Sequence, residues 1–109
     1  MNYSDGAATA DHLLKQPIDA IFAFTDTLAI GVMNKSIGRK IPEDIAIAGF
    51  SGTEISTVVS PQLTTVEPNQ FKMGEQAANL LIKHIENQSF DNEKNIVNAD
   101  IIYRNSTEQ

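Results

Sequence analysis

The residues best placed to bind a ligand lie in two short polar segments, each directly after an apolar run. Thr25 and Asp26 follow residues 18–24, and residues 51–54 (Ser-Gly-Thr-Glu) follow residues 45–50. Ligands of open α/β sheets bind outside the carboxyl ends of the strands, so neighbouring strands would bring these groups to one crevice. Hydroxyl groups and a carboxylate there suit a polyol, sugar or nucleoside-like ligand. Helix capping and turn formation explain the same residue types equally well, and both interpretations stay open at this point.

The other reactive side chains form no recognisable catalytic or metal-binding pattern. His12 and His84 fall in helix-like segments, where we expect half-exposed side chains and not a general base or a metal ligand. No HExxH, GxSxG or phosphate-loop motif occurs. A phosphate-accepting receiver domain needs several acidic residues at neighbouring strand ends to hold Mg²⁺, and Asp26 stands alone. We therefore expect no enzymatic activity, no metal and no cofactor.

Composition narrows the class of protein. The 109 residues fit one domain or part of one. The net charge of −6, from 14 acidic and 8 basic residues, argues against this chain gripping a nucleic-acid backbone by itself. The absence of cysteine excludes disulfides and thiolate metal sites. No apolar run approaches the roughly 20 residues of a membrane span, and the start of the chain does not resemble a signal peptide, so the cytoplasm is the default location.

Apolar periodicity predicts alternating helices and strands. A strand, a helix and a second strand over residues 18–50 are typical of parallel pairing, so the fold class is α/β with a parallel sheet flanked by helices. The nearly continuous apolar run at 18–24 predicts a strand covered on both faces. Gly49 marks a bend at the end of the second strand. After an irregular start at residues 1–6, we expect a helix from residue 7 to before Pro17 and another between Asp26 and Gly38. Strands are expected at 18–24, 45–50, 64–66 and 96–103. Pro68 stands where a helix could start, and we expect a long helix at about 69–86, followed by a polar loop at 87–95.

Four segments carry motifs in a recognisable order and spacing. They are PIDAIFAFTDTLAIGVM (17–33), IPEDIAIAGFSGTEIS (41–56), SPQLTTVEPNQFKMGEQAANLLIKHI (60–85) and IIYRNST (101–107). Together they resemble the C-terminal part of LacI/GalR-family transcriptional repressors, and the last segment is similar to the family's closing strand and its Arg-x-Ser-Thr end. The resemblance extends over nearly the whole chain from residue 7 onward.

The resemblance implies a periplasmic-binding-protein-like core that holds a small effector, often a sugar or a nucleobase, between two lobes. Such proteins carry an N-terminal helix-turn-helix domain and a hinge helix, and effector binding changes the spacing of the DNA-reading heads. The DNA-binding domain, the hinge and the main segment of the first lobe are absent here. We therefore expect a partial effector-binding and dimerisation domain over residues 1–109, with residues 7–50 in the C-terminal lobe, about 51–68 crossing toward the N-terminal lobe, and 69–109 returning.

Carried over by position, the resemblance implies ligand contacts at Thr25, Ser51 and Gln70. Ser51 stands where the family has an Asp that grips ligand hydroxyls, and Thr25 replaces an Asn. Serine cannot match the charge-assisted hydrogen bonds of a carboxylate, so we expect a less hydroxyl-rich ligand, or one gripped mainly by residues outside this chain. Asp26 is also a candidate ligand residue, with helix capping as an equal alternative.

The resemblance also places dimer contacts on Ile30, Met33 and Val59. Their apolar character fits an exposed interface, and an ordinary core role is the alternative. The predicted function is effector sensing and homodimerisation in a bacterial LacI-type regulator that reaches operator DNA only through a separate N-terminal domain. A periplasmic-type sugar receptor of the same fold is the alternative, disfavoured by the missing signal peptide. A third possibility is a half-domain that only dimerises.

Overall fold

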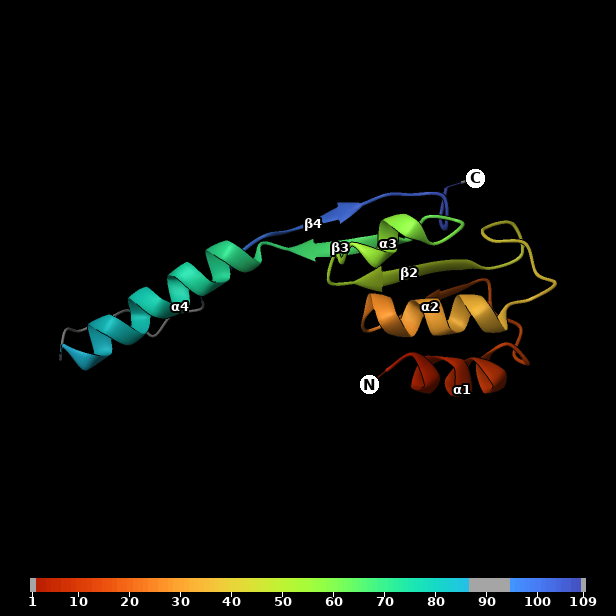
Figure 1. The fold of residues 1–109 in the computed structure, drawn as a ribbon, viewed down its shortest axis with the longest axis horizontal. Coiled ribbons are helices and arrows are strands. Elements are labelled where there is room, and N and C mark those ends of the chain that lie inside the picture. The colour runs from red at the N-terminus through yellow and green to blue at the C-terminus, as the bar shows by residue number, and fades with distance from the viewer. Residues whose placement is uncertain (1, 87–94, 109) are drawn as a thin grey trace. The chain divides into compact units, whose positions relative to one another are not determined.

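The computed structural model describes residues 2–86 and 95–108, and helices and strands alternate along the chain (Figure 1). A four-stranded sheet has the order β1-β2-β3-β4. β2 pairs in parallel with both β1 and β3, whereas the arrow of β4 points opposite to that of β3 in Figure 1. The elements are α1 (Tyr3–Leu13), β1 (Ala20–Phe22), α2 (Asp26–Lys35), β2 (Ala46–Phe50), α3 (Ile55–Val58), β3 (Thr64–Pro68), α4 (Gln70–Ile85) and β4 (Ala99–Ile102).

The chain divides into two compact units. The first unit is residues 1–67 with 101–109, and the second is residues 68–100. Residues 51–67 therefore stay with the first strands, because hydrogen bonds from this segment to Asp26 and Arg104 hold it there. Which lobe of a two-lobed core each unit belongs to stays a prediction.

α1 begins earlier than predicted because its first residues form a capping box. The Asn2 side chain accepts a hydrogen bond from the Asp5 amide at 3.1 Å, and the Asp5 carboxylate accepts one from the Asn2 amide at 2.7 Å. The same hydrogen bond from Asn2 holds the pKa of Asp5 below its usual value. The predicted irregular start at residues 1–6 is therefore wrong from Tyr3 onward.

α1 lies directly against α2 (Figure 1), and two glycines permit the contact. A Cβ atom on Gly6 would lie 2.3 Å from the Leu28 carbonyl oxygen, and one on Gly31 would lie 2.3 Å from the Tyr3 carbonyl oxygen. The two helix backbones thus meet at positions where no side chain fits. This pairing covers the Gly31 side of α2 within the chain itself.

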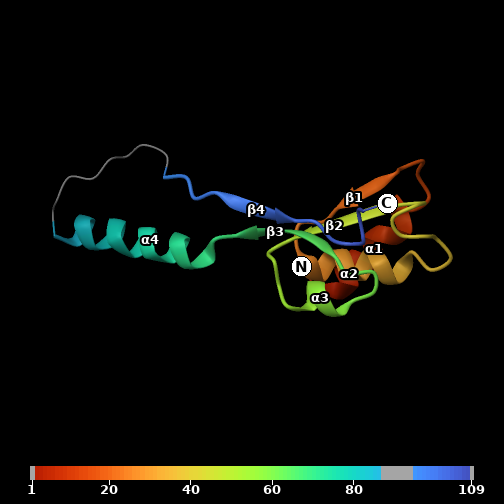
Figure 2. The ribbon, with the colours of Figure 1, turned by 90° about the horizontal axis from the view of Figure 1, so that it is seen from above.

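The sheet has one covered face and one open face in the part of the chain that the structure describes. Figure 2 shows α1 and α2 on the same side of the strands. Side chains alternate along a strand, so Ile47 and Ala23 are buried toward α2, whereas Phe22 and Phe24 are 66% and 73% exposed on the other face. The predicted cover on both faces is therefore wrong for these residues. The buried core consists of Ala10, Ala23, Ala29, Ile30, Val32, Ile45, Ile47 and Leu63.

Residues 104–106, near the end of the chain, connect β2 to β3 through hydrogen bonds. Ser106 is fully buried; its hydroxyl donates to the Ile47 carbonyl at 2.6 Å and accepts from the Thr64 amide at 2.8 Å. The Arg104 guanidinium donates to the Leu63 carbonyl at 2.9 Å and to the Ser56 hydroxyl at 2.7 Å. The Arg-x-Ser-Thr end recognised in the sequence therefore stabilises the first unit and anchors α3.

The second unit contains α4, which runs over the predicted range within one residue at each end. Asn69 caps it by accepting a hydrogen bond from the Lys72 amide at 3.1 Å, and Pro68 ends β3 instead of starting the helix. None of its residues is buried, and most of its large apolar side chains, including Phe71 and Leu81, are exposed. The predicted loop at 87–95 lies outside the described residues except for its last residue. β4 is shorter than the predicted strand at 96–103.

Among residues 2–86 and 95–108, no helix combines the length and the apolar character needed to cross a membrane.

Candidate functional site

Thr25 joins β1 to α2 and caps the helix. Its backbone is extended, and its hydroxyl accepts a hydrogen bond from the Leu28 amide at 3.2 Å. The cap satisfies one of the amides that a helix start leaves without a partner. The capping interpretation of Thr25 is therefore confirmed. The hydroxyl hydrogen is still a donor, so capping does not prevent contact with a ligand.

Asp26 is buried and fully engaged within the chain. It is 1% exposed, and one carboxylate oxygen accepts from the Thr53 amide at 2.8 Å and from the Thr53 hydroxyl at 2.7 Å. The other oxygen accepts from the Thr65 hydroxyl at 2.5 Å. Asp26 thus ties the first turn of α2 to the segment after β2 and to β3. Its side chain does not cap α2, as one interpretation held, and its contact with a ligand stays a prediction.

Because Gly49 has no side chain, there is room beside it for the Asp26 carboxylate. A Cβ atom at residue 49 would lie 2.5 Å from a carboxylate oxygen of Asp26 and 3.2 Å from a methyl carbon of Leu63. Gly49 is paired with Thr65 in the regular register of β2 and β3. Its role is to make room for the buried carboxylate; the register gives no sign of the predicted bend.

Ser51 begins a turn held in an unusual backbone conformation. Its φ is 125°, and φ of the following Gly52 is 67°. The Ser51 amide donates to the Val66 carbonyl at 2.9 Å, and the Gly52 amide donates to the Thr65 hydroxyl at 3.1 Å. A positive φ is costly for serine, so β3 and the Asp26–Thr53 hydrogen bonds must hold the turn in place. The result is a fixed position for the Ser51 side chain.

Thr25 and Ser51 meet at one cavity, as the sequence predicts for groups at the ends of neighbouring strands. The cavity has a volume of about 450 Å³ and is lined by Phe22, Phe24, Thr25, Phe50 and Ser51. Asp26 is not part of its wall. We therefore take this cavity, at the carboxyl ends of β1 and β2, as the candidate ligand site.

The three phenylalanines were missed as site residues by the sequence reasoning. Phe22 pairs with Ala48 in the β1–β2 register, and continuing this register by two residues places Phe24 beside Phe50. The available signal was the spacing of Phe22 and Phe24, since residues two apart on a strand share a face. An apolar run alone does not tell a face covered by helices from the wall of a cavity.

Gln70, the remaining predicted ligand residue, belongs to the second unit. It is the first residue of α4 and is exposed. Its contact with a ligand stays a prediction.

The predicted dimer residues are more buried than expected. Ile30 is 9% exposed and belongs to the core, and Met33 and Val59 are partly buried against that core. Ile30 therefore has the ordinary core role that was the alternative, and the prediction that its side chain is exposed is wrong. A contact of these residues with a second subunit stays a prediction.

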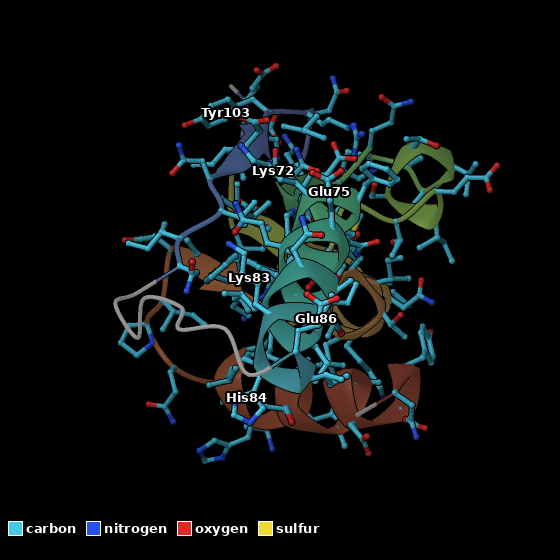
Figure 3. All side chains as sticks on the ribbon, turned by 90° about the vertical axis from the view of Figure 1, so that its left-hand side faces the viewer. Lys72, Glu75, Lys83, His84, Glu86 and Tyr103 are labelled. Carbon is cyan, nitrogen blue, oxygen red and sulfur yellow. The ribbon has the colours of Figure 1, made fainter. Side chains whose placement is uncertain are left out.

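Both histidines lie on exposed helix positions. His12 is in the last turn of α1, and His84 is in the last turn of α4, where it extends away from the helix axis (Figure 3). Within residues 2–86 and 95–108, no group of His, Cys, Asp and Glu side chains could hold a metal ion. The cavity wall is mainly apolar and aromatic, which suits a ligand with an apolar face.

The class defined by this fold and site is one ligand-binding unit of a periplasmic-binding-protein-like core. A family profile described as "Periplasmic binding protein-like domain" matches residues 2–107. The chain belongs to this family, in the form that LacI-family transcription regulators carry as their effector-binding domain. The predicted fold class and family resemblance are both confirmed.

Three relatives illustrate the similarity. The ribose operon repressor of Halalkalibacterium halodurans is 36% identical over 92 residues, which are 83% of this chain and 28% of the repressor. The structure of the regulator CcpA of Lactococcus lactis matches with a TM-score of 0.91 and 27% identity over 99% of this chain and 41% of that one. A LacI-family regulator from Enterococcus faecium with bound ribose matches with a TM-score of 0.83 and 28% identity, over 98% of this chain and 41% of its own. The chain thus spans well under half the length of each relative.

Proposed function

We propose that this chain is the effector-sensing and dimerisation part of a bacterial LacI-type transcription regulator, and not an enzyme. The observation that carries the proposal is the cavity at the carboxyl ends of β1 and β2, which Thr25 and Ser51 line together with three phenylalanines. Two relatives support it, since one is named as a ribose operon repressor and another was solved with ribose. The ligand class is a small sugar- or nucleoside-like molecule. A regulator of this kind acts on DNA in the cytoplasm.

The proposed ligand is held by groups whose positions the fold fixes before binding. Thr25 stands at the start of α2, and Ser51 lies in a turn fastened by β3 and by the Asp26–Thr53 hydrogen bonds. Preorganised groups lose little freedom when they bind, which favours affinity. The ligand switches the regulator only if it binds one arrangement of the two lobes better than the other.

The proposal includes an assignment of the two units to lobes. We infer that residues 1–67 and 101–109 belong to one lobe, and that residues 68–100 are this chain's part of the other lobe. The division of the chain at residues 67 and 100 supports this assignment over the predicted crossing at 51–68. The exposed apolar side chains of α4 fit a helix that packs on further residues of its own lobe.

Homodimerisation and operator binding are the remaining parts of the proposal. The dimer contacts are proposed at Ile30, Met33 and Val59, of which the last two keep part of their surface exposed. Operator DNA is reached through an N-terminal domain outside this chain, because the net charge of −6 does not suit a phosphate backbone. No membrane is involved.

The test uses the complete protein encoded at the same locus. Its affinity for DNA upstream of its own gene is measured by fluorescence anisotropy, with and without ribose, cellobiose, sucrose, adenosine and cytidine. One of these ligands should shift the affinity about tenfold, and the double change Thr25→Ala with Ser51→Ala should remove the shift without removing DNA binding. A complete protein that binds a sugar but never DNA would favour the alternative, a periplasmic-type sugar receptor of the same fold.

A further inference from the structure

We propose that Thr65 is a positioning residue of the ligand site, because its buried hydroxyl holds Thr25 and Ser51 in the arrangement that a ligand meets. The inference rests on the proposed function, since it assumes that the cavity at the carboxyl ends of β1 and β2 is the effector site. It concerns how the site is built, and it applies to any ligand that contacts both polar residues of the cavity wall.

The Thr65 hydroxyl connects the two segments of the chain that carry these polar wall residues. It donates a hydrogen bond to a carboxylate oxygen of Asp26 at 2.5 Å, and Asp26 directly follows Thr25. It also accepts a hydrogen bond from the Gly52 amide at 3.1 Å, and Gly52 directly follows Ser51. One oxygen atom on β3 is therefore bonded to the residue next to each polar wall residue.

Thr65 acts through these neighbours, since it is fully buried and has no surface to offer a ligand. A buried hydroxyl is costly unless it is hydrogen-bonded, and here it both donates and accepts. Thr65 pairs with Gly49 in the β2–β3 register, and the missing side chain of Gly49 leaves the room in which the Asp26 carboxylate reaches the hydroxyl. Valine would fill the same space, so what threonine adds at this position is the pair of hydrogen bonds.

The turn that begins at Ser51 needs such a link because its backbone is strained. The φ of Ser51 is 125°, which is costly for a residue with a side chain. The bond from the Ser51 amide to the Val66 carbonyl, at 2.9 Å, joins backbone atoms and survives a change of side chain. Removing the Thr65 hydroxyl would therefore keep β2 and β3 paired but release the Gly52 amide and one oxygen of Asp26. Wall residues that are no longer fixed must be ordered when a ligand binds, which lowers the affinity.

The experiment compares changes at two neighbouring threonines of β3. Thr65→Val removes the hydroxyl, Thr65→Ala does the same if the valine chain does not fold, and Thr65→Ser keeps the hydroxyl. Thr64→Val is the matched control, because Thr64 is also buried but its hydroxyl is bonded near the end of the chain. That hydroxyl accepts from the Arg104 amide at 2.8 Å and lies 2.6 Å from the Thr107 hydroxyl.

Two measurements follow, one without ligand and one with it. In NMR spectra of the ¹⁵N-labelled 109-residue chain, Thr65→Val should move the Gly52 amide proton signal upfield, and Thr65→Ser and Thr64→Val should leave it in place. In the complete protein encoded at the same locus, fluorescence anisotropy follows DNA binding during titration with ribose or adenosine. Thr65→Val should raise the ligand concentration that gives half of the affinity shift about tenfold, against less than about threefold for Thr65→Ser and Thr64→Val. The full shift should return at saturation, whereas a merely unfolded fraction would lower its size and leave the midpoint unchanged.

The outcomes separate the role of Thr65 from the proposed function. If ribose or adenosine acts on the wild type and on Thr65→Val at the same concentration, or if Thr64→Val raises that concentration equally, the positioning role is overturned and the proposed function stands. If neither probe acts on the wild type, the proposed function fails for these two ligands. The Gly52 signal then decides the inference: an upfield shift in Thr65→Val that Thr65→Ser reverses supports it, and an unmoved signal overturns it.

Discussion

Replacing Asp26 by Asn tests the account of how the site is held together. The change keeps the size of the side chain but removes a charge that accepts three hydrogen bonds from Thr53 and Thr65. If the amide oxygen faces Thr53, two bonds weaken from charged to neutral, which costs about 1 kcal/mol each, and the bond from Thr65 is lost or inverted at a cost of about 1–2 kcal/mol. Relief from burying a carboxylate offsets about 1 kcal/mol. The net loss in the free energy of unfolding should be about 2–3 kcal/mol, or about 8–20 °C in melting temperature.

The assay is urea denaturation followed by circular dichroism, with Asp11→Asn as the matched control. The Asp11 side chain is 60% exposed in an ion pair with Lys35 at 3.5 Å, so its replacement should cost under about 1 kcal/mol. Thr65→Val removes one of the same hydrogen bonds, so the double change with Asp26→Asn should cost less than the sum of the two by about 1 kcal/mol or more. A loss below about 0.5 kcal/mol for Asp26→Asn, or strict additivity with Thr65→Val, would refute the reasoning.

Three further changes test the geometry around the cavity. Gly49→Ala places a Cβ atom 2.5 Å from an Asp26 carboxylate oxygen and should lower stability by about 1–3 kcal/mol; a wild-type urea midpoint would show that the strand has room to spare. Ser51→Gly relieves a φ of 125° and should raise stability by about 1 kcal/mol while weakening ligand binding in calorimetry; a lower midpoint would contradict the strained turn. Arg104→Ala removes donors to Leu63 and Ser56 and should cost about 1–3 kcal/mol, against under about 0.5 kcal/mol for its exposed neighbour Asn105→Ala; equal effects would remove the anchoring role of the guanidinium.

The order of helices and strands was predictable because it depends on local patterns. The period of apolar residues located β2 and α4, and Thr25 had the residue type and position of a helix cap. The convergence of Thr25 and Ser51 also followed from local information, once parallel pairing of two neighbouring strands was assumed. The capping box that starts α1 at Tyr3 was missed, although Asn2 and Asp5 have the spacing that such a box requires.

The rest depends on partners that are distant in the sequence. The burial of Asp26 is set by Thr53 and Thr65, which are 27 and 39 positions away, so its type alone could not distinguish a cap, a ligand contact and a buried acceptor. The boundary at residue 67 depends on hydrogen bonds from Arg104. The open face with Phe22 and Phe24 could not be predicted, because the sequence of an apolar strand has the same pattern whether helices or a ligand cover that face.

The most direct test of the effector site is a titration of the ¹⁵N-labelled 109-residue chain with adenosine, followed by two-dimensional NMR and repeated with ribose. The account predicts shifts that centre on the amides of Thr25, Ser51 and Gly52 and leave α1 unchanged, and that disappear when Thr25 and Ser51 are both replaced by alanine. Shifts confined to other surfaces, or no shift at millimolar concentrations of either ligand, would contradict the assignment of this cavity as the site where an effector binds.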